Sequence, residues 1–132
     1  MDGKVRAAVI GVGIGYLHLQ GYAKSPHAEV VAVCDIDKGR AERVASEFGV
    51  PHVFTDYKEM LKMDEIDMVS VCVPNYLHAP VTIDCFEAGK HVVCEKPMAM
   101  NAIEGAAMVE AAKKANRKLM MAFNNRFRGD TQ

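Results

Sequence analysis

The chain has 132 residues, of which half are hydrophobic and a quarter are charged, and its formal net charge is −1. A length of this order predicts one domain that can bury its own core. The near-neutral charge argues against a nucleic-acid or membrane-surface role, and no apolar run reaches membrane-spanning length. The first residues lack a signal-peptide layout, because their short apolar run leads directly into glycines.

The first half of the chain alternates between strand and helix patterns. An apolar strand at 4–10 runs into a glycine loop, and a helix follows at 16–24. The β-branched run at 30–34 predicts a buried strand. A helix is then expected between an N-cap at Asp37 and a C-terminal Gly49, because apolar residues recur at i, i+3, i+4 and i+7.

The second half continues the alternation. Its predicted elements are a strand at 53–54, a short helix at 55–62 capped by Thr55 or Asp56, a strand at 68–73, a helix at 80–88, a strand at 91–94, a helix from Asn101 to about Ala115, and a strand at 118–123. Such alternation predicts an α/β fold with a doubly wound parallel sheet, covered on both faces, with strand order 3-2-1-4-5-6.

The four cysteines do not form a C-x-x-C pair, which argues against a structural zinc site or a redox pair. Apolar neighbours indicate reduced core residues of a cytosolic protein. We expect no metal site. The cysteines are Cys34, Cys72, Cys85 and Cys94.

The glycine loop reads G-x-G-x-G, with Gly11, Gly13 and Gly15, whereas the dinucleotide-binding fingerprint is G-x-G-x-x-G. Tyr16 stands where the third fingerprint glycine belongs. Glycines let the backbone approach a phosphate, and the following helix offers free N–H groups and a positive dipole end. Tight strand-to-helix turns also use glycine for packing alone, so the loop leaves both readings open.

Asp35 ends the second predicted strand, 24 residues after Gly11. An acid in this position of a βαβ unit accepts hydrogen bonds from the adenosine-ribose hydroxyls, and it repels a 2′-phosphate. This favours NAD over NADP, although the nearby Arg40 would tolerate a 2′-phosphate. The alternative is that Asp35 is a cap or turn residue.

An S-adenosylmethionine-dependent methyltransferase is a competing reading of the same loop and acid. The first motif of those enzymes has an acid two residues before the first glycine, where this chain has Val9. The loop alone leaves this alternative open.

Glu95, Lys96 and Pro97 follow the fifth predicted strand, at the sheet edge where α/β proteins bind ligands. Pro97 fixes the chain direction. Lys96 would therefore sit on rigid backbone beside the nicotinamide. Its ammonium can hydrogen-bond a substrate oxygen or join a proton relay.

The chain resembles the glucose–fructose oxidoreductase/inositol dehydrogenase/MocA family in five segments that occur in order. These are the glycine loop, Asp35, "VPNYLHAP", "GKHVVCEKPMAMN" and "MAFNNRF". The resemblance covers essentially the whole chain but only the N-terminal half of a family enzyme. It implies an NAD(P)-binding Rossmann domain over 1–123. Residues 124–132 would begin the connection to a C-terminal substrate domain that the chain lacks.

The resemblance also implies residue roles, with Lys96 as the catalytic residue near nicotinamide and substrate. If one residue is deleted after Gly13, Gly15 falls on the third fingerprint glycine and His18 on a trailing histidine. The expected cofactor-binding residues are Gly11, Gly13, Ile14, Gly15, Asp35, Ile36, Pro74, Asn75, His78, Glu95, Lys96, Asn124 and Arg126.

The implied activity is hydride transfer between NAD(P) and a secondary alcohol or ketone of a sugar, cyclitol or related small molecule. The domain alone is expected to bind cofactor without turnover, and a homo-oligomer is expected only with the second domain. The alternatives are a non-catalytic nucleotide-binding or sensory domain and, less favoured because of the E-K-P segment, the methyltransferase.

Overall fold

The computed structural model describes residues 4–95 and 101–122. The strands are β1 (Val5–Ile10), β2 (Ala28–Cys34), β3 (His52–Phe54), β4 (Met68–Val71), β5 (His91–Glu95) and β6 (Leu119–Ala122). The helices are α1 (Gly15–Lys24), α2 (Lys38–Phe48), α3 (Tyr57–Met60), α4 (His78–Glu87) and α5 (Ala102–Ala115), with a 3₁₀ turn η1 (Asn75–Leu77).

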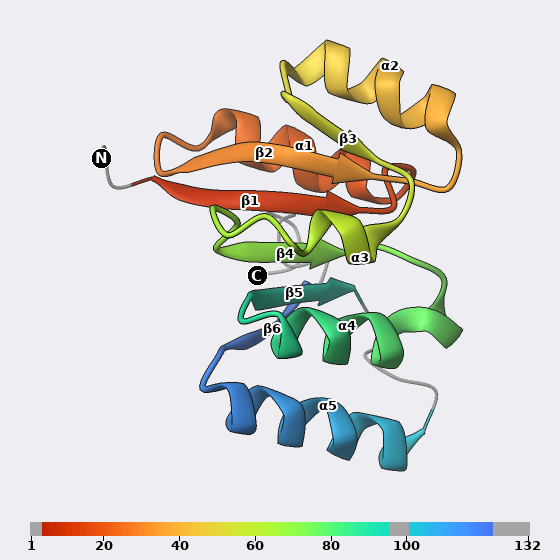
Figure 1. Ribbon diagram of the computed structural model, residues 1–132, viewed down its shortest axis with the longest axis vertical. Coiled ribbons are helices and arrows are strands. Elements are labelled where there is room, and N and C mark those ends of the chain that lie inside the picture. Colours follow the sequence, from red (N-terminus) through yellow and green to blue (C-terminus); the bar gives the residue numbers. More distant parts are fainter. Residues whose placement is uncertain (1–3, 96–100, 123–132) are drawn as a thin grey trace, which may run out of the picture.

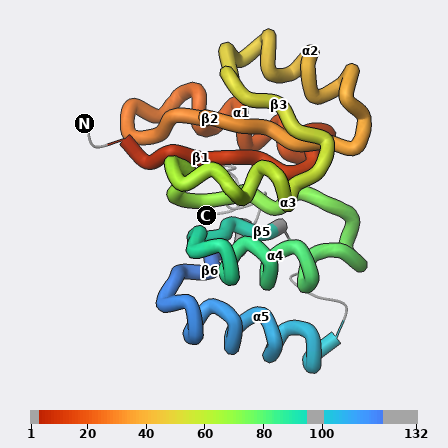
Figure 2. Tube along the Cα trace, viewed as in Figure 1, coloured from red at the N-terminus to blue at the C-terminus, as the bar shows by residue number. Residues whose placement is uncertain are grey.

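All six strands are parallel and form one sheet in the order β3-β2-β1-β4-β5-β6. This confirms the predicted order. The chain starts at the centre of the sheet, builds outward through β2 and β3, and then crosses to β4 to build the other half (Figures 1 and 2).

Helices divide the buried apolar side chains into two layers. In Figure 1, α3 and α4 lie in front of the sheet and α1 lies behind it. The front layer includes Val69, Phe86 and Met108, and the layer under α1 and α2 includes Val9 and Leu19, all of them buried. Each layer excludes water from one face of the sheet, which is the main driving force for this fold.

The second face of β4, β5 and β6 carries a groove beside α1. Among the described residues, no helix lies over this part of the sheet beyond the flank of α1. Met68, Val93 and Met120 instead line a groove of about 800 Å³ together with residues of α1 such as Leu17. Leu17 and Met120 are each 58% exposed. The sheet flanked by helices agrees with the predicted doubly wound fold, and among the described residues this groove lies on the face of β4–β6 beside α1.

The helix ends agree with the capping signals in the sequence. Asp37 Oδ1 accepts from the Arg40 N–H at 3.1 Å, and Asn101 Oδ1 accepts from the Glu104 N–H at 2.9 Å. Asp56, one of the two predicted caps of the short helix, accepts from the Lys58 N–H. Gly49 ends α2 in the left-handed region with φ +68°. These contacts satisfy main-chain groups that a helix leaves unpaired at its ends.

The predicted bounds near the fourth strand need correction. β4 ends at Val71, two residues earlier than expected, and α4 begins at His78 instead of Pro80. Pro80 falls within the first turn of α4, where a helix does not need the missing N–H. The interval between β4 and α4 is thus shifted two residues towards the N-terminus, and η1 occupies its second half.

At the amino ends of the strands, polar side chains tie neighbouring loops together. The buried Lys90 donates from Nζ to the Met63 carbonyl at 2.7 Å. Burial lowers the pKa of this lysine. Asp67 Oδ2 accepts from the Arg6 main-chain N–H at 2.8 Å and lies 3.5 Å from Arg6 Nε. This amino edge is thus held by contacts that involve none of the predicted cofactor residues.

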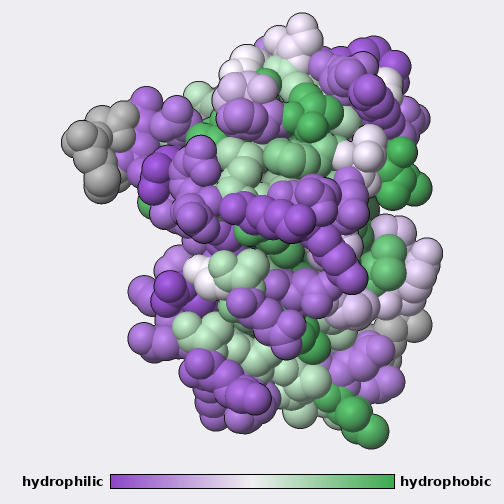
Figure 3. All heavy atoms as spheres, viewed as in Figure 1, coloured by the Kyte–Doolittle hydropathy of each residue, from purple (hydrophilic) through white to green (hydrophobic). Residues whose placement is uncertain are grey.

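The four cysteines are all buried and form no disulfide, as the sequence predicts. Within residues 4–95 and 101–122, no helix combines the length and the apolar character needed to cross a membrane. The same residues contain no cluster of three or more His, Cys, Asp or Glu side chains that could hold a metal ion. Figure 3 shows hydrophilic residues over much of α2 and in a band over α3 and the turn after it.

Candidate functional site

The predicted site residues meet at the carboxyl edge of the sheet, because all the strands run in the same direction. Ile10 of β1 lies beside Cys34 of β2 and Val71 of β4, and Val71 lies beside Cys94 of β5. The glycine loop, Asp35 and the turn after β4 therefore emerge side by side. Ligands of open α/β sheets bind at this edge, near the point where the strand order reverses.

Gly11 is required by both its backbone conformation and its close neighbour. Its φ is +88°, and its N–H donates to the Cys34 carbonyl at 2.8 Å. A Cβ at this position would lie 2.3 Å from the Cys72 carbonyl oxygen. No other residue fits without moving β4 away from the loop.

Gly15 lets α1 pack directly against β1. A Cβ here would lie 2.5 Å from Val9 Cγ1 and 3.6 Å from Cys72 Sγ. Its N–H donates to the Gly11 carbonyl at 3.0 Å, so the loop closes one turn before α1 continues. Close packing of helix and strand is the role of the third glycine in the fingerprint, and Gly15 makes such a contact with β1.

Tyr16 points away from the loop and joins α1 to α2. Its hydroxyl donates to Glu47 Oε2, which raises the pKa of the phenol. Its ring meets that of Phe48 edge to face, with centroids 5.3 Å apart and planes at 70°. The bulky residue at the place of the third fingerprint glycine therefore packs between helices and leaves the loop clear.

Gly13 and Ile14 form the part of the loop that is open to a ligand. Among the described residues, none accepts a hydrogen bond from the main-chain N–H of Gly13 or Ile14. The nearest atom to a Cβ built on Gly13 is Arg40 Nη1, at 3.8 Å. The first turn of α1 contains no acidic residue. Free N–H groups at a helix N-terminus suit an anion such as a phosphate.

Asp35 lies against this loop, and its carboxylate is almost fully buried. Oδ2 accepts from the Val12 N–H at 3.0 Å, and Oδ1 accepts from the Asp37 N–H at 2.9 Å. Arg40 Nη2 lies 3.1 Å from Oδ1 and 3.2 Å from Oδ2. The carboxylate thus joins the glycine loop to the start of α2, and its side chain is only 3% exposed.

These contacts also set the ionisation of the acid. Burial raises the pKa of Asp35, but the hydrogen bonds from the Asp37 N–H, the Arg40 guanidinium and the Val12 N–H together outweigh it. The pKa therefore lies below its ordinary value. Asp35 is a fixed negative charge at neutral pH. Ile36, which follows it, is 92% exposed beside this acid.

The Pro74–Asn75 turn follows β4, and the buried side chain of His78 contacts its main chain. The Leu77 N–H donates to the Pro74 carbonyl at 2.8 Å. His78 is 1% exposed, and its Nε2 lies 2.8 Å from the Val73 carbonyl. The structure therefore shows His78 in contact with the main chain of the turn. A direct contact between His78 and a cofactor stays a prediction.

Of the remaining predicted site residues, one ends strand β5 and three lie outside the described residues. Glu95 is the last residue of β5, so its backbone reaches the carboxyl edge. Lys96, Asn124 and Arg126 lie outside the described residues, as does Pro97.

Two contributions to the site were missed by sequence reasoning. One is the Val12 main-chain N–H, which has no signature in the sequence. The other is the ion pair between Arg40 and Asp35. Asp35 and Arg40 are five residues apart, on either side of the N-cap Asp37 of α2. This spacing could have predicted that the two side chains meet.

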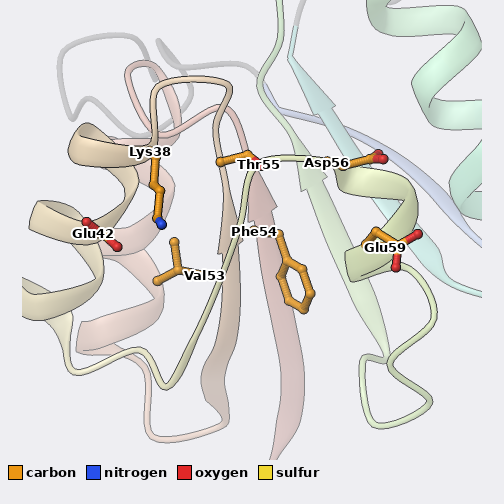
Figure 4. Close-up of a pocket in the computed structure, with 7 residues that line it drawn as sticks. All are labelled: Lys38, Glu42, Val53, Phe54, Thr55, Asp56 and Glu59. Atoms are coloured by element: carbon orange, nitrogen blue, oxygen red, sulfur yellow. The ribbon is translucent and has the colours of Figure 1, made fainter.

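A second hollow, of about 320 Å³, lies at the edge strand β3. Figure 4 shows Lys38 and Glu42 of α2 on one side of this strand and Asp56 and Glu59 on the other. Asp56 is already used as the cap of α3. Because its charged groups do not converge on one point, this hollow is a weaker candidate than the carboxyl edge.

The sequence profile described as "Oxidoreductase family, NAD-binding Rossmann fold" matches residues 5–123. The chain belongs to the glucose–fructose oxidoreductase/inositol dehydrogenase/MocA family. The matched segment contains the glycine loop, Asp35 and the turn after β4, so the carboxyl edge described above belongs to the NAD-binding Rossmann domain of this family.

Curated members of the family support this assignment. D-glucoside 3-dehydrogenase of Escherichia coli (strain K12) is 38% identical over 130 residues, which cover 97% of the chain and 37% of that protein. Myo-inositol 2-dehydrogenase of Thermotoga maritima is 34% identical over 124 residues, which cover 93% of the chain and 37% of that protein. The chain thus spans a little over a third of the length of these relatives.

Solved structures of the family have the same fold. The WlbA dehydrogenase from Chromobacterium violaceum, crystallised in complex with NADH and UDP-GlcNAcA, superimposes with a TM-score of 0.90 at 36% identity. The match covers 96% of the chain and 37% of that protein.

The residues present fit a nicotinamide dinucleotide. Gly13 leaves space that a side chain would fill, and two free N–H groups border it. A buried carboxylate stands at the end of β2. This is the donor and acceptor set that a pyrophosphate and a ribose need.

Proposed function

We propose that the chain is the cofactor-binding part of an enzyme that transfers a hydride between NAD(P) and a secondary alcohol or ketone of a sugar or cyclitol. The observation that carries this proposal is the open Gly13–Ile14 loop beside the buried Asp35. The names of the relatives, a glucoside and an inositol dehydrogenase, favour this substrate class.

In this proposal each part of the cofactor has its own residues. The N–H groups of Gly13 and Ile14 bind the pyrophosphate, while Gly11 and Gly15 give the loop its shape. Asp35 binds the adenosine ribose, with Ile36 beside it. The turn at Pro74 and Asn75 lies against the cofactor, and His78 supports that turn.

Lys96 is the proposed catalytic residue, since it directly follows Glu95 at the end of β5. Its ammonium would hold the substrate oxygen and exchange a proton with it. The bound cofactor supplies the hydride chemistry, and the protein orients it. Asn124 and Arg126 would complete the cofactor-binding set, in a segment 124–132 that leads to a substrate domain. Residues 1–123 form the cofactor domain.

The remaining features fit a cytoplasmic enzyme. Four buried cysteines that form no disulfide suit a reducing compartment. We place oligomer formation with the substrate domain, as no part of the proposed cofactor site needs a second copy.

Titration of the chain with NADH and NADPH, followed by nucleotide fluorescence, tests the proposal. Gly13→Ala adds a methyl group where the phosphate would lie, and its nearest neighbour is a flexible arginine atom at 3.8 Å. We therefore expect folding to be kept and affinity to fall about ten-fold or more, because two N–H groups lose their close approach.

Gly21→Ala is the matched control, since a Cβ on Gly21 meets nothing within 4 Å and the residue lies away from the loop in α1. It should bind like the unmodified chain. Absence of binding by the unmodified chain, or equal binding by Gly13→Ala, would contradict the proposal.

A further inference from the structure

Arg40 covers the acid that the ribose needs. Its Nη2 lies within 3.2 Å of both Asp35 oxygens, and its Nη1 reaches to 3.8 Å from the Cβ position of Gly13. The guanidinium therefore lies between the ribose-binding acid and the phosphate-binding glycine. It extends from α2, and its side chain is 46% exposed, whereas that of Asp35 is 3% exposed.

The carboxylate of Asp35 has no free acceptor position in this structure. A carboxylate offers about four lone-pair sites, two on each oxygen. Oδ1 receives the Asp37 N–H and Arg40, and Oδ2 receives the Val12 N–H and Arg40. The two main-chain donors are fixed by the loop and by α2. A ribose diol can therefore hydrogen-bond Asp35 only if the guanidinium moves.

The two cofactors place different demands on that movement. The 2′-hydroxyl of NAD must replace Arg40 at the carboxylate. The 2′-phosphate of NADP would be repelled by Asp35, but it offers the displaced guanidinium a bidentate, charge-assisted partner. Because Arg40 is half exposed, its guanidinium can turn towards solvent or towards a bound phosphate, and Asp35 then keeps its two main-chain donors.

We propose that Arg40 sets the choice between NAD and NADP, by competing with the ribose of NAD for Asp35 and by pairing with the 2′-phosphate of NADP. This inference rests on the proposed function and adds a specificity-determining residue to it. It means that the acid at the end of β2 does not by itself make the domain specific for NAD.

The test compares dissociation constants for NADH and NADPH in the unmodified chain and in Arg40→Ala. We expect NADH to bind about two- to five-fold tighter, because a weak competing ion pair is lost. We expect NADPH to bind about ten-fold weaker or worse, because a charge-assisted phosphate contact is lost. The ratio of the two constants then changes by more than about twenty-fold.

Arg43→Ala provides the matched control, because it removes the same charge from an exposed arginine of the same helix. It should change both constants by less than about two-fold. Arg40→Lys keeps the positive charge but removes the planar guanidinium that can donate two parallel hydrogen bonds. It should therefore lose less NADPH affinity than Arg40→Ala. Urea unfolding of each variant shows that the chain is folded, and Arg40→Lys decides the question if Arg40→Ala is not.

The measurements distinguish failure of the proposed role of Arg40 from failure of the proposed function. If the unmodified chain binds both cofactors and Arg40→Ala leaves their ratio unchanged, or weakens both equally, the inference is wrong and the proposed function stands. If the unmodified chain binds neither cofactor, the proposed function itself fails.

Discussion

Individual glycines of the loop have different physical reasons to be glycine. Gly11 is fixed by a positive φ and by the carbonyl of Cys72, whereas Gly15 is fixed by contact between α1 and β1. Gly13 meets neither constraint within the described fold and borders the proposed phosphate site. The residue type alone does not distinguish a packing glycine from a ligand-binding one.

Gly15→Ala should destabilise the chain by about 1–3 kcal/mol, because the new methyl group would lie 2.5 Å from Val9 Cγ1 and would push α1 from β1. In the same helix, Gly21→Ala should stabilise it by about 0.5–1 kcal/mol, since it meets open space. Urea unfolding at equilibrium measures both. Equal effects of the two substitutions would contradict the packing role of Gly15.

The spacing of the glycines and of Asp35 was enough to predict the loop and the acid beside it. The role of Tyr16 was not predictable, because it depends on Glu47 and Phe48 of a different helix. The contact between Arg40 and Asp35 was only partly readable. Proximity follows from the sequence, but the direction of a long arginine side chain depends on its surroundings.

Among the elements, the segment from β4 to α4 differs most from its predicted form. The sequence pattern extended the strand to Val73 and began the helix at Pro80. In the structure η1 fills the interval, and α4 starts at His78. Apolar residues at 72–73 prolong the strand pattern, although Cys72 and Val73 already belong to the turn. Tertiary contacts, here with His78 and the glycine loop, decide where the strand ends.

His78→Ala should lower the free energy of unfolding by about 2–4 kcal/mol, because it leaves a cavity and an unpaired Val73 carbonyl under the turn. His27→Ala, at an exposed histidine before β2, should change it by less than about 0.5 kcal/mol. Thermal and urea unfolding compare the two. A small effect at His78 would mean that the turn does not depend on its support.

For the molecule as a whole, the strand order was predictable from the sequence, whereas the groove beside α1 was not. Alternating strands and helices restrict a parallel sheet to few topologies, so the order 3-2-1-4-5-6 followed from the pattern. The strands β4 and β5 look apolar on both faces in sequence. The groove of about 800 Å³ beside α1 depends on which helices pack there, and the local sequence does not encode this.

A pair of methionines tests this uneven cover. Met108 of α5 is 0% exposed, so Met108→Ala should cost about 2–5 kcal/mol. Met120 of β6 is 58% exposed in the groove, so Met120→Ala should change stability by about 0.5 kcal/mol or less. Both are read from urea unfolding of the chain. A large cost at Met120 would show that the groove is filled in solution.

The ties between Lys90 and Met63 and between Arg6 and Asp67 have a consequence for how this domain can evolve. They stabilise the amino edge, while the proposed cofactor residues all stand at the opposite edge. Exchange of a half-exposed side chain such as Arg40 touches none of these ties, and Asp35 keeps its two main-chain donors when the guanidinium is removed. If Arg40 sets the cofactor preference as proposed, a lineage that carries this domain can change its preferred cofactor by a substitution at one position of α2 while the amino edge keeps its contacts.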